Sequence, residues 1–196
     1  MVILLLAMQR LVSNVEKFEK LIHFQQQYAQ IQKEHFFENI LFSYHWWFLI
    51  TSTIIVWVTW LLLVNKKRLI PIIIVGFITC LLAIIMDDIG LSLAAWAYPY
   101  RLLYFTSRLT PVDMAIIPVT YMLIYQYFRK WKYYLIATAG FGLFASFIAE
   151  PLFVHFNLYM MLSWEYWYSA PIYFVMGIFA KGVVDTLEKR LIINVY

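Results

Sequence analysis

Residues 133–161, YYLIATAGFGLFASFIAEPLFVHFNLYMM, decide the fold of this chain, because a carboxylate, Glu150, interrupts a long apolar run. The run exceeds the ~20 residues that a helix needs to cross the hydrocarbon core of a bilayer. A charged side chain inside hydrocarbon is costly and generally marks a paired or functional group. Any interpretation of the chain must therefore account for Glu150.

The composition of the whole chain indicates a membrane protein. Of its 196 residues, 64% are hydrophobic and 13% are charged, and the mean hydropathy is +0.74. Soluble domains are about 45–50% apolar and about 25% charged. The single cysteine, Cys80, excludes an internal disulfide and a cysteine-based zinc site.

The apolar runs predict an all-α fold, an integral membrane bundle of five transmembrane helices with an N-terminal amphipathic or interfacial helix. The predicted spans are 44–64, 69–91, 111–128, 133–158 and 170–187, each near the ~20 residues that a crossing helix needs. They divide the chain into an N-terminal tail (1–43), one transmembrane domain (44–190) and a C-terminal tail (191–196).

The N-terminal tail carries mixed charge and apolar residues at helical spacing. The apolar positions are Val15, Phe18, Leu21 and Ile22, and three glutamines at 25–27 interrupt the apolar face. Such a helix lies on a membrane or packs against a bundle. A partner-binding or lid helix is one interpretation, and an interfacial segment leading into the first span is the favoured one.

Most lysine and arginine residues fall in short connections on one side of the predicted bundle. That side holds Lys66, Lys67, Arg68, Arg129, Lys130, Lys132, Lys189 and Arg190, whereas the loops on the other side hold Arg101 and Arg108. Because Lys and Arg concentrate in cytoplasmic loops, the first side is predicted to be cytoplasmic. The C-terminus is then inside and the N-terminus outside. The net charge of +4 is explained in this way, without a nucleic-acid partner.

This orientation places several ionisable groups at one depth, in the outer half of the bilayer. Glu150 lies 17 residues beyond Tyr133, which is about 25 Å along a helix. Asp87 and Asp88 lie at a similar height on the second span. Asp113, His45 and His155 are also predicted on that side. The convergence of these groups predicts one polar layer.

Small residues at four-residue spacing predict which helix faces point inward, because they let membrane helices pack closely. The two stripes are Thr138, Gly142, Ser146 and Glu150, and Gly76, Cys80, Ala83 and Asp87. Pro151 removes one helical hydrogen bond next to Glu150, which favours a bend and a cavity there.

Each polar candidate also has a purely structural interpretation. Thr110, Pro111 and Asp113 match a helix start, with a cap, a proline and an acidic residue in the first turn. Lys181 and Asp185 are one turn apart and form an ion pair within one helix, although Lys181 could also reach the acidic layer as a counter-ion. Glu150 itself could be a structural carboxylate.

Two segments dense in Trp and Tyr, residues 96–101 and 164–169, flank the outer ends of the spans. Aromatic belts at the membrane surface have this composition, and so do the walls of ligand pockets. Both interpretations stay open, with Tyr98 as a candidate in the second. Arg101 and Arg108 are further candidate counter-ions for the acidic layer, because arginine pairs favourably with carboxylates.

The predicted ligand-binding residues are Asp87, Asp88, Asp113, Glu150, His155, Lys181, Arg101 and Tyr98. The sequence identifies no catalytic residue and no cofactor. The chain has four scattered histidines, so a metal site would need mostly carboxylates, with Asp87 and Glu150 as its candidates.

Several motifs between Lys66 and Lys189 resemble those of an uncharacterised family of small multi-pass membrane proteins from spore-forming Gram-positive bacteria. They are Asp87-Asp88-Ile89-Gly90, Trp96-Ala97-Tyr98-Pro99-Tyr100-Arg101, Pro111-Val112-Asp113, Pro118, YMLIYQY at 121–127, Trp131-Lys132, Ala149-Glu150-Pro151-Leu152-Phe153 and a run from Tyr173 through Ala180-Lys181. The resemblance implies a bacterial cytoplasmic membrane and no particular activity.

The leading functional hypothesis is a polar acidic site in the outer half of the bilayer that binds or passes a cation, a proton or a lipid-like ligand. One alternative is a membrane-embedded enzyme that uses the carboxylates as acid and base on a lipid, although the sequence has no H-E-x-x-H or G-x-S-x-G motif. Another is a scaffold subunit of a larger membrane complex. The lipid bilayer is the one expected partner, and a homo-oligomer or a membrane-complex partner stays open.

Overall fold

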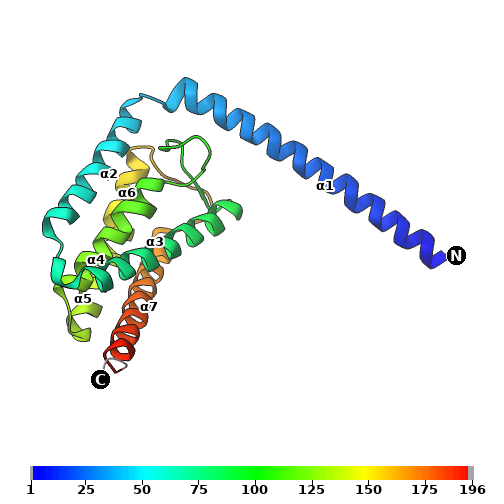
Figure 1. Ribbon diagram of the computed structural model, residues 1–196. Helices are drawn as coiled ribbons and strands as arrows, with labels where there is room; N and C mark the ends of the chain where they lie inside the picture. Colours follow the sequence, from blue (N-terminus) through cyan, green and yellow to red (C-terminus); the bar gives the residue numbers. More distant parts are fainter. Residues whose placement is uncertain (1, 194–196) are drawn as a thin grey trace. The chain divides into compact units, whose positions relative to one another are not determined.

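The computed structural model describes the backbone of residues 2–193 and the side chains of residues 14–190. The chain divides into two compact units, Met1–Leu41 and Phe42–Tyr196. The first unit is a long helix, α1 (Val2–His35), followed by one π-helical segment, η1 (Phe36–Ile40) (Figure 1). The tail is therefore helical, and its exposed side chains include Phe18 and Leu21. Its placement at a membrane surface stays a prediction.

The second unit is a bundle of helices joined by short connections and two longer loops (Figure 1). In chain order it contains α2 (Tyr44–Leu63), η2 (Lys66–Arg68), α3 (Leu69–Ser92), β1 (Trp96–Ala97), η3 (Val112–Ile116), α4 (Ile117–Tyr127), α5 (Trp131–Phe144), η4 (Ala145–Ala149), α6 (Glu150–His155), β2 (Met160–Met161) and α7 (Tyr166–Ile193). The fold is all-α, as the apolar runs predicted.

Four helices of this unit are long and apolar enough to cross a membrane: Tyr44–Leu63, Lys66–Ser92, Trp131–His155 and Tyr166–Arg190. They coincide with four of the five predicted spans. The remaining predicted span, 111–128, is helical over residues 110–127, a stretch that contains η3 and α4. It is not among the four helices that are both long and apolar enough to cross a membrane, so a fifth crossing stays a prediction.

Two π-helical segments interrupt the bundle helices, each ending two residues before a proline. η3 ends at Ile116, before Pro118, and η4 ends at Ala149, before Pro151. A proline cannot donate a backbone hydrogen bond and its ring crowds the preceding turn, and a wider turn relieves both problems. A π segment therefore lies just before Glu150, next to the proline at which the sequence predicts a bend.

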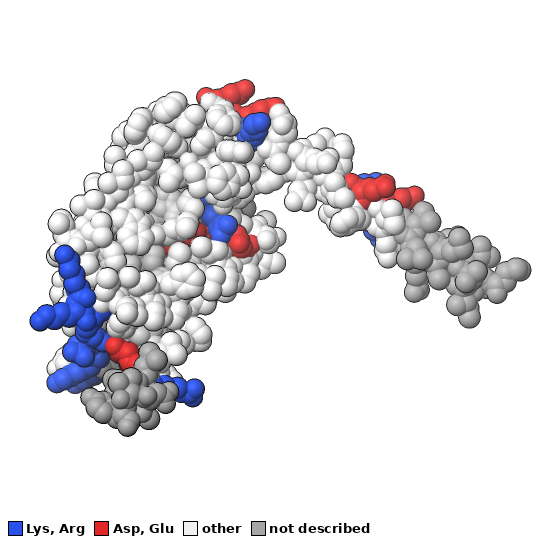
Figure 2. Space-filling view, in the orientation of Figure 1, with Lys and Arg blue, Asp and Glu red and all other residues white. Residues whose placement is uncertain are grey.

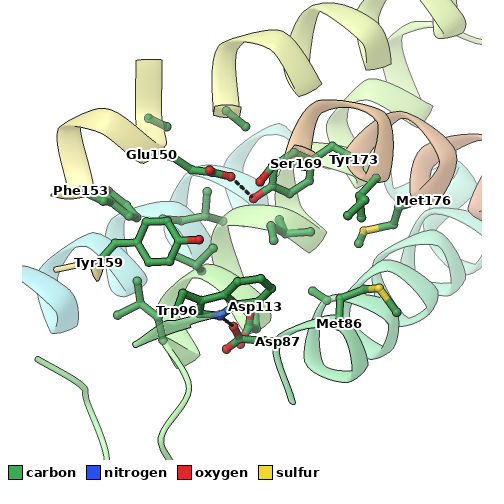
Figure 3. Close-up of a pocket in the computed structure, with 18 of the residues that line it drawn as sticks. Met86, Asp87, Trp96, Asp113, Glu150, Phe153, Tyr159, Ser169, Tyr173 and Met176 are labelled. Carbon is green, nitrogen blue, oxygen red and sulfur yellow. Dashed lines mark hydrogen bonds between the residues drawn. The ribbon is translucent and has the colours of Figure 1, made fainter. Parts of the chain in front are cut away.

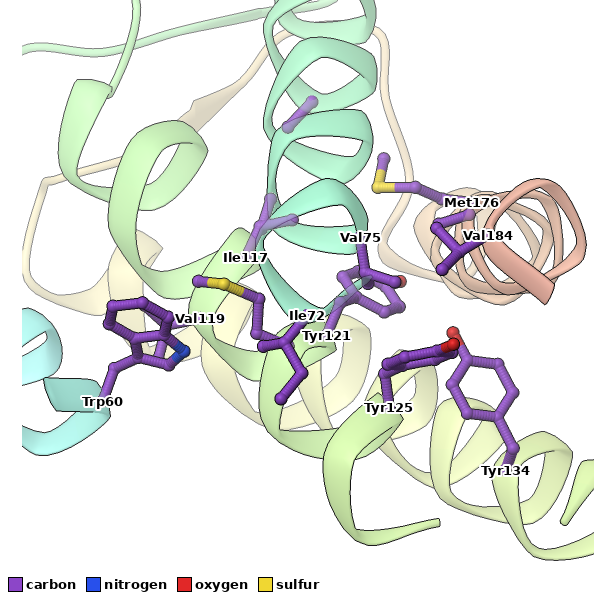
Figure 4. Packing of buried hydrophobic residues seen from close by; sticks show 13 residues of the cluster. Trp60, Ile72, Val75, Ile117, Val119, Tyr121, Tyr125, Tyr134, Met176 and Val184 are labelled. Atoms are coloured by element: carbon purple, nitrogen blue, oxygen red, sulfur yellow. The ribbon is translucent and has the colours of Figure 1, made fainter. Parts of the chain in front are cut away.

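The main core lies among α3, α4, α5 and α7, and buried tyrosines connect these helices (Figure 4). The Tyr134 hydroxyl donates to the carbonyl of Gly177 at 2.8 Å, and the Tyr121 hydroxyl donates to the carbonyl of Tyr173. Trp60 packs onto the same core from α2. A buried tyrosine adds a large apolar surface only if its hydroxyl finds a partner, and these two do.

The predicted small-residue stripes face the bundle. A side chain carbon added at Gly177 would lie 2.4 Å from Thr138, and one at Gly142 would lie 2.9 Å from the carbonyl oxygen of Ala170. On α3, Gly76 is packed in the same way against Met122 of α4. α5 and α7 therefore approach closely along the stripe that leads to Glu150, as predicted.

One end of the second unit, here called the basic end, carries the lysine and arginine residues of η2, of the connection before α5 and of the end of α7 (Figure 2). Hydrogen bonds hold these connections together. The side chain of Gln126 donates to the carbonyl of Leu63 at 3.0 Å, and Arg68 pairs with Glu188 at 3.1 Å.

The opposite end, here called the loop end, consists of residues 93–110 and 156–165. The two loops pair through β1 and β2, whose partners are Trp96 with Met161 and Ala97 with Met160. The first loop also contacts α2, because the Trp46 indole donates to the carbonyl of Leu102 at 3.2 Å. These contacts fix the aromatic loops over the helix ends.

Candidate acidic cavity

A cavity of about 160 Å³ opens beneath the loop end, among α3, η3, η4 and α7 (Figure 3). Most of its wall is apolar or aromatic. Its ionisable groups are the carboxyls of Asp87, Asp113 and Glu150 and the hydroxyls of Tyr98, Tyr159 and Tyr173. We call it the acidic cavity. A largely apolar pocket with a few convergent polar groups is typical of small-molecule binding sites.

Asp87 is held in place by two aromatic side chains from the loop that follows its helix. Its Oδ1 accepts from the Trp96 indole at 2.7 Å and from the Tyr98 hydroxyl at 2.6 Å. Trp96 reaches this position because Gly90 leaves room, since an added side chain carbon there would lie 1.9 Å from the indole ring. One glycine in α3 thus allows the loop to reach back to the carboxyl one turn earlier.

Asp113, from η3, places its carboxyl against that of Asp87 (Figure 3). Both side chains are about 95% buried, with exposed fractions of 5% for Asp87 and 4% for Asp113. Two carboxyls in contact away from water carry one proton between them, because two like charges there repel strongly. Asp113 lies in the first turn of a helix that starts at residue 110, as the helix-start interpretation expects, but its carboxyl also lines the cavity, and the Thr110 hydroxyl makes no capping hydrogen bond.

Glu150 occupies another part of the cavity wall, where α6 begins after the π segment. Its Oε1 accepts from the Tyr173 hydroxyl at 3.3 Å, and the Ser169 hydroxyl lies close to the same carboxyl (Figure 3). Ser169 in turn accepts from the Trp164 indole at 2.9 Å. The carboxyl is therefore positioned from α7, the helix against which the small-residue stripe packs.

Each of the three carboxyls keeps one buried oxygen that accepts no hydrogen bond from the residues that the structure describes. These atoms are Asp87 Oδ2, Asp113 Oδ2 and Glu150 Oε2. A proton shared by the two aspartates gives their carboxyls one hydrogen bond, whereas Glu150 Oε2 stays without a donor. Buried acceptors without donors are costly, so the cavity favours an occupant that brings hydrogen-bond donors or positive charge.

The tyrosines above the carboxyls remain donors. Burial raises the pKa of Tyr98 well above its ordinary value, and the neighbouring Asp87 carboxyl raises it further. Burial, followed by the charge of Glu150, also raises the pKa of Tyr159. The rings of these two tyrosines stack, with centroids 5.5 Å apart. Both hydroxyls therefore stay protonated at physiological pH.

The structure brings Asp87, Asp113, Glu150 and Tyr98 to one cavity, whereas other predicted residues lie elsewhere. Asp88 is exposed and pairs with Arg108 at 3.2 Å, because it is turned about 100° from Asp87 on the helix. His155 is exposed beyond the end of the cavity wall. Arg101 is buried in the loop but does not line the cavity.

Lys181 is far from the predicted acidic layer and belongs to the basic end. It is 2% exposed, and its ammonium pairs with Asp185 at 3.1 Å and lies over the ring of Tyr125 at 4.8 Å. The ion pair within one helix is confirmed, and the counter-ion alternative is wrong. The carboxylate and the aromatic faces stabilise the ammonium of Lys181 where it is, and extending toward the loop end would break these contacts.

Metal binding receives no support from the side-chain arrangement. Within the described residues, no three His, Cys, Asp or Glu side chains converge as metal ligands would. Asp87 and Glu150, the candidate ligands, share the cavity but are held by different helices and by different donors.

Tyr159 and Tyr173 also line the cavity, although the sequence did not indicate them, whereas Trp96 and Ser169 belong to the two aromatic segments that were possible pocket walls. Ser169 and Tyr173 are one helical turn apart, so their spacing alone could have paired them on one face of α7. Tyr159 lies in a loop and carried no such signal, because irregular segments have no period. Within the aromatic segments, Trp96 and Trp164 line the cavity, as the pocket interpretation predicts, whereas Trp167 is exposed.

Comparison of the chain with known protein families, with curated proteins and with solved structures gives no match. The functional argument therefore rests on the geometry of the cavity.

Proposed function

We propose that this protein is a multi-pass membrane protein whose acidic cavity binds a small amphiphilic amine. In this proposal the ammonium group enters among the carboxyls of Asp87, Asp113 and Glu150. The observation that carries the proposal is the set of three buried carboxyl oxygens that lack a donor within the described part of the chain. A primary ammonium supplies N–H donors and a positive charge, which unsatisfied carboxyl oxygens accept.

The rest of the cavity suits an apolar body attached to such a head group. Its walls include Phe141, Phe144 and Phe153, together with the Trp96 ring. Aromatic faces also attract cations, by about 0.5–2 kcal/mol. A carboxylic acid or a phosphate would instead meet carboxyls of the same sign, so the proposal excludes anionic ligands.

Five crossings with the basic end in the cytoplasm complete the proposal. α3 begins at the basic end and α5 begins there too (Figure 1), so the chain between them must return, and η3 with α4 is the segment that does so. The helical stretch 110–127 extends about 27 Å, close to the ~30 Å of a hydrocarbon core. The family resemblance supports a bacterial cytoplasmic membrane, and the lysine and arginine distribution favours an N-terminus outside.

Calorimetry of the protein in dodecyl maltoside tests the binding proposal with hexylamine, hexanol and hexanoate. Hexylamine should bind, hexanol should bind at least about tenfold more weakly, and hexanoate should not bind. Glu150→Gln and Asp87→Asn should each weaken hexylamine binding by about tenfold or more. The matched control, Asp88→Asn, changes an exposed carboxylate beside the site and should leave the affinity unchanged.

Equal binding of hexanol and hexylamine would overturn the ammonium proposal, as would hexylamine binding that survives both substitutions. The orientation has its own test, in which Gln30→Cys in a Cys80→Ser background is labelled on intact cells. Labelling from outside supports the proposed topology, and labelling only after lysis contradicts it.

A further inference from the structure

A second apolar depression lies between α3 and α7 and shares part of its wall with the acidic cavity. Leu82, Val175 and Phe179 line only this groove, whereas Met86, Ile172 and Met176 line both spaces. The groove has a volume of about 460 Å³ and exposes no polar atom. It is therefore separated from the carboxyls by a wall of only a few side chains.

The groove opens on the outer surface of the bundle. Val175 is 62% exposed and Phe179 is 54% exposed on α7, which is one of the helices long and apolar enough to cross a membrane. Nothing polar in the groove would select a head group or a peptide backbone. A hydrocarbon chain is the occupant whose chemistry matches a wholly apolar wall within a bilayer.

The wall between the groove and the acidic cavity contains two flexible methionine side chains. Met86 and Met176 approach from α3 and α7 on the same side of the cavity (Figure 3). Methionine has an unbranched, flexible side chain that fills irregular gaps and adapts to a ligand. A change of rotamer at these two residues would connect the groove to the cavity without moving a helix.

We infer that the ligand is a long-chain amine whose alkyl chain lies in the α3–α7 groove, and that it reaches the carboxyls laterally from the bilayer. This inference rests on the proposed function and adds the chain and the route. The ammonium occupies the acidic cavity, the first carbons pass Met86 and Met176, and the remaining chain lies along Val175 and Phe179. The ligand class is then a single-chain lipid amine rather than a water-soluble one.

The test compares dodecylamine and hexylamine binding to the wild type and to Val175→Trp, by calorimetry in dodecyl maltoside. Val175→Trp should fill the groove, weakening dodecylamine binding at least about tenfold while leaving hexylamine binding unchanged. Partition into the micelle is the same for both proteins, so it cancels in their ratio. Ile136→Trp is the matched control, because Ile136 is 62% exposed on α5, outside the groove.

The outcomes separate the two proposals. Hexylamine binding with unchanged dodecylamine affinity in Val175→Trp overturns the groove and leaves the acidic cavity standing. Absence of hexylamine binding to the wild type overturns the proposed function itself. A terminal diazirine on dodecylamine gives an independent readout: it should label residues 175–179 of α7, and labelling of cavity residues alone contradicts the inferred path.

Discussion

The two ends of the bundle both bury charge, but they do so in different ways. At the basic end the charges that lie against the core have partners: Lys181 pairs with Asp185, and Arg68 pairs with Glu188. The Tyr125 hydroxyl also donates to both Asp185, at 3.2 Å, and Glu188, at 3.1 Å. These five side chains form what we call the basic-end network.

The carboxyls of the acidic cavity have fewer partners. Its carboxyls accept hydrogen bonds on one oxygen and leave another without a donor among the described residues. No lysine or arginine lines the cavity within that part of the chain. Paired charge at the basic end thus stabilises the fold, whereas the acidic cavity keeps carboxyl oxygens to which a ligand can donate hydrogen bonds. Removing a charge should therefore have opposite consequences at the two ends.

The largest effect is expected at the basic end, for Lys181→Met. The substitution leaves Asp185 without its cation in a mostly buried place, and breaking such a pair costs about 3–5 kcal/mol. Thermal unfolding in detergent should show the loss, and the double substitution Lys181→Met, Asp185→Leu should recover most of it. Lys132→Met, at an exposed position, is the control. An unchanged melting temperature in Lys181→Met would contradict the claim that the paired charges of the basic end stabilise the fold.

A smaller loss is expected for Gly90→Ala at the loop end. The added methyl group would collide with the Trp96 indole, and overpacking of this kind costs about 1–3 kcal/mol. Displacement of Trp96 should also weaken hexylamine binding, since it positions Asp87. Gly140→Ala is the matched control, because it has open space around it and should be neutral or stabilising by up to ~1 kcal/mol. Equal stability of the two variants would contradict the packing argument.

Glu150→Gln should change stability by less than about 1 kcal/mol, because an amide is cheaper to bury than a carboxylate with an unsatisfied oxygen. The same variant should lose hexylamine binding. Unfolding and calorimetry on one preparation separate the two effects. A loss of stability as large as that of Lys181→Met would make Glu150 a structural carboxylate and end the distinction between the two sites.

The smallest effect is expected for Asp88→Asn. Its ion pair with Arg108 is exposed, and such pairs contribute about 0–1 kcal/mol. Unfolding and binding should both stay near wild type. A marked loss of binding here would place the functional carboxylate outside the cavity.

The sequence was most informative where a regular helix repeats its pattern. Hydropathy located the four long spans, and the small-residue stripes correctly turned Asp87 and Glu150 inward. Both features depend only on residue spacing along one helix. The convergence of these two residues at one cavity followed from their equal depth on neighbouring helices.

Features that depend on irregular backbone could not be predicted from the sequence. Thr110, Pro111 and Asp113 have the spacing of a helix start, and only the path of η3 shows that Asp113 turns into the cavity. A π segment inserts an extra residue into a helix, so faces beyond it no longer follow the simple period. The burial of Trp96 against Gly90 depends on a loop that no period describes.

The most direct test of the central claim is an experimental density map of the protein with 6-bromohexylamine. The account predicts density in the acidic cavity, with the nitrogen within hydrogen-bond distance of Asp87, Asp113 or Glu150 and the bromine toward Met86 and Met176. Density at another surface, or a cavity that holds only water at saturating amine, would contradict it.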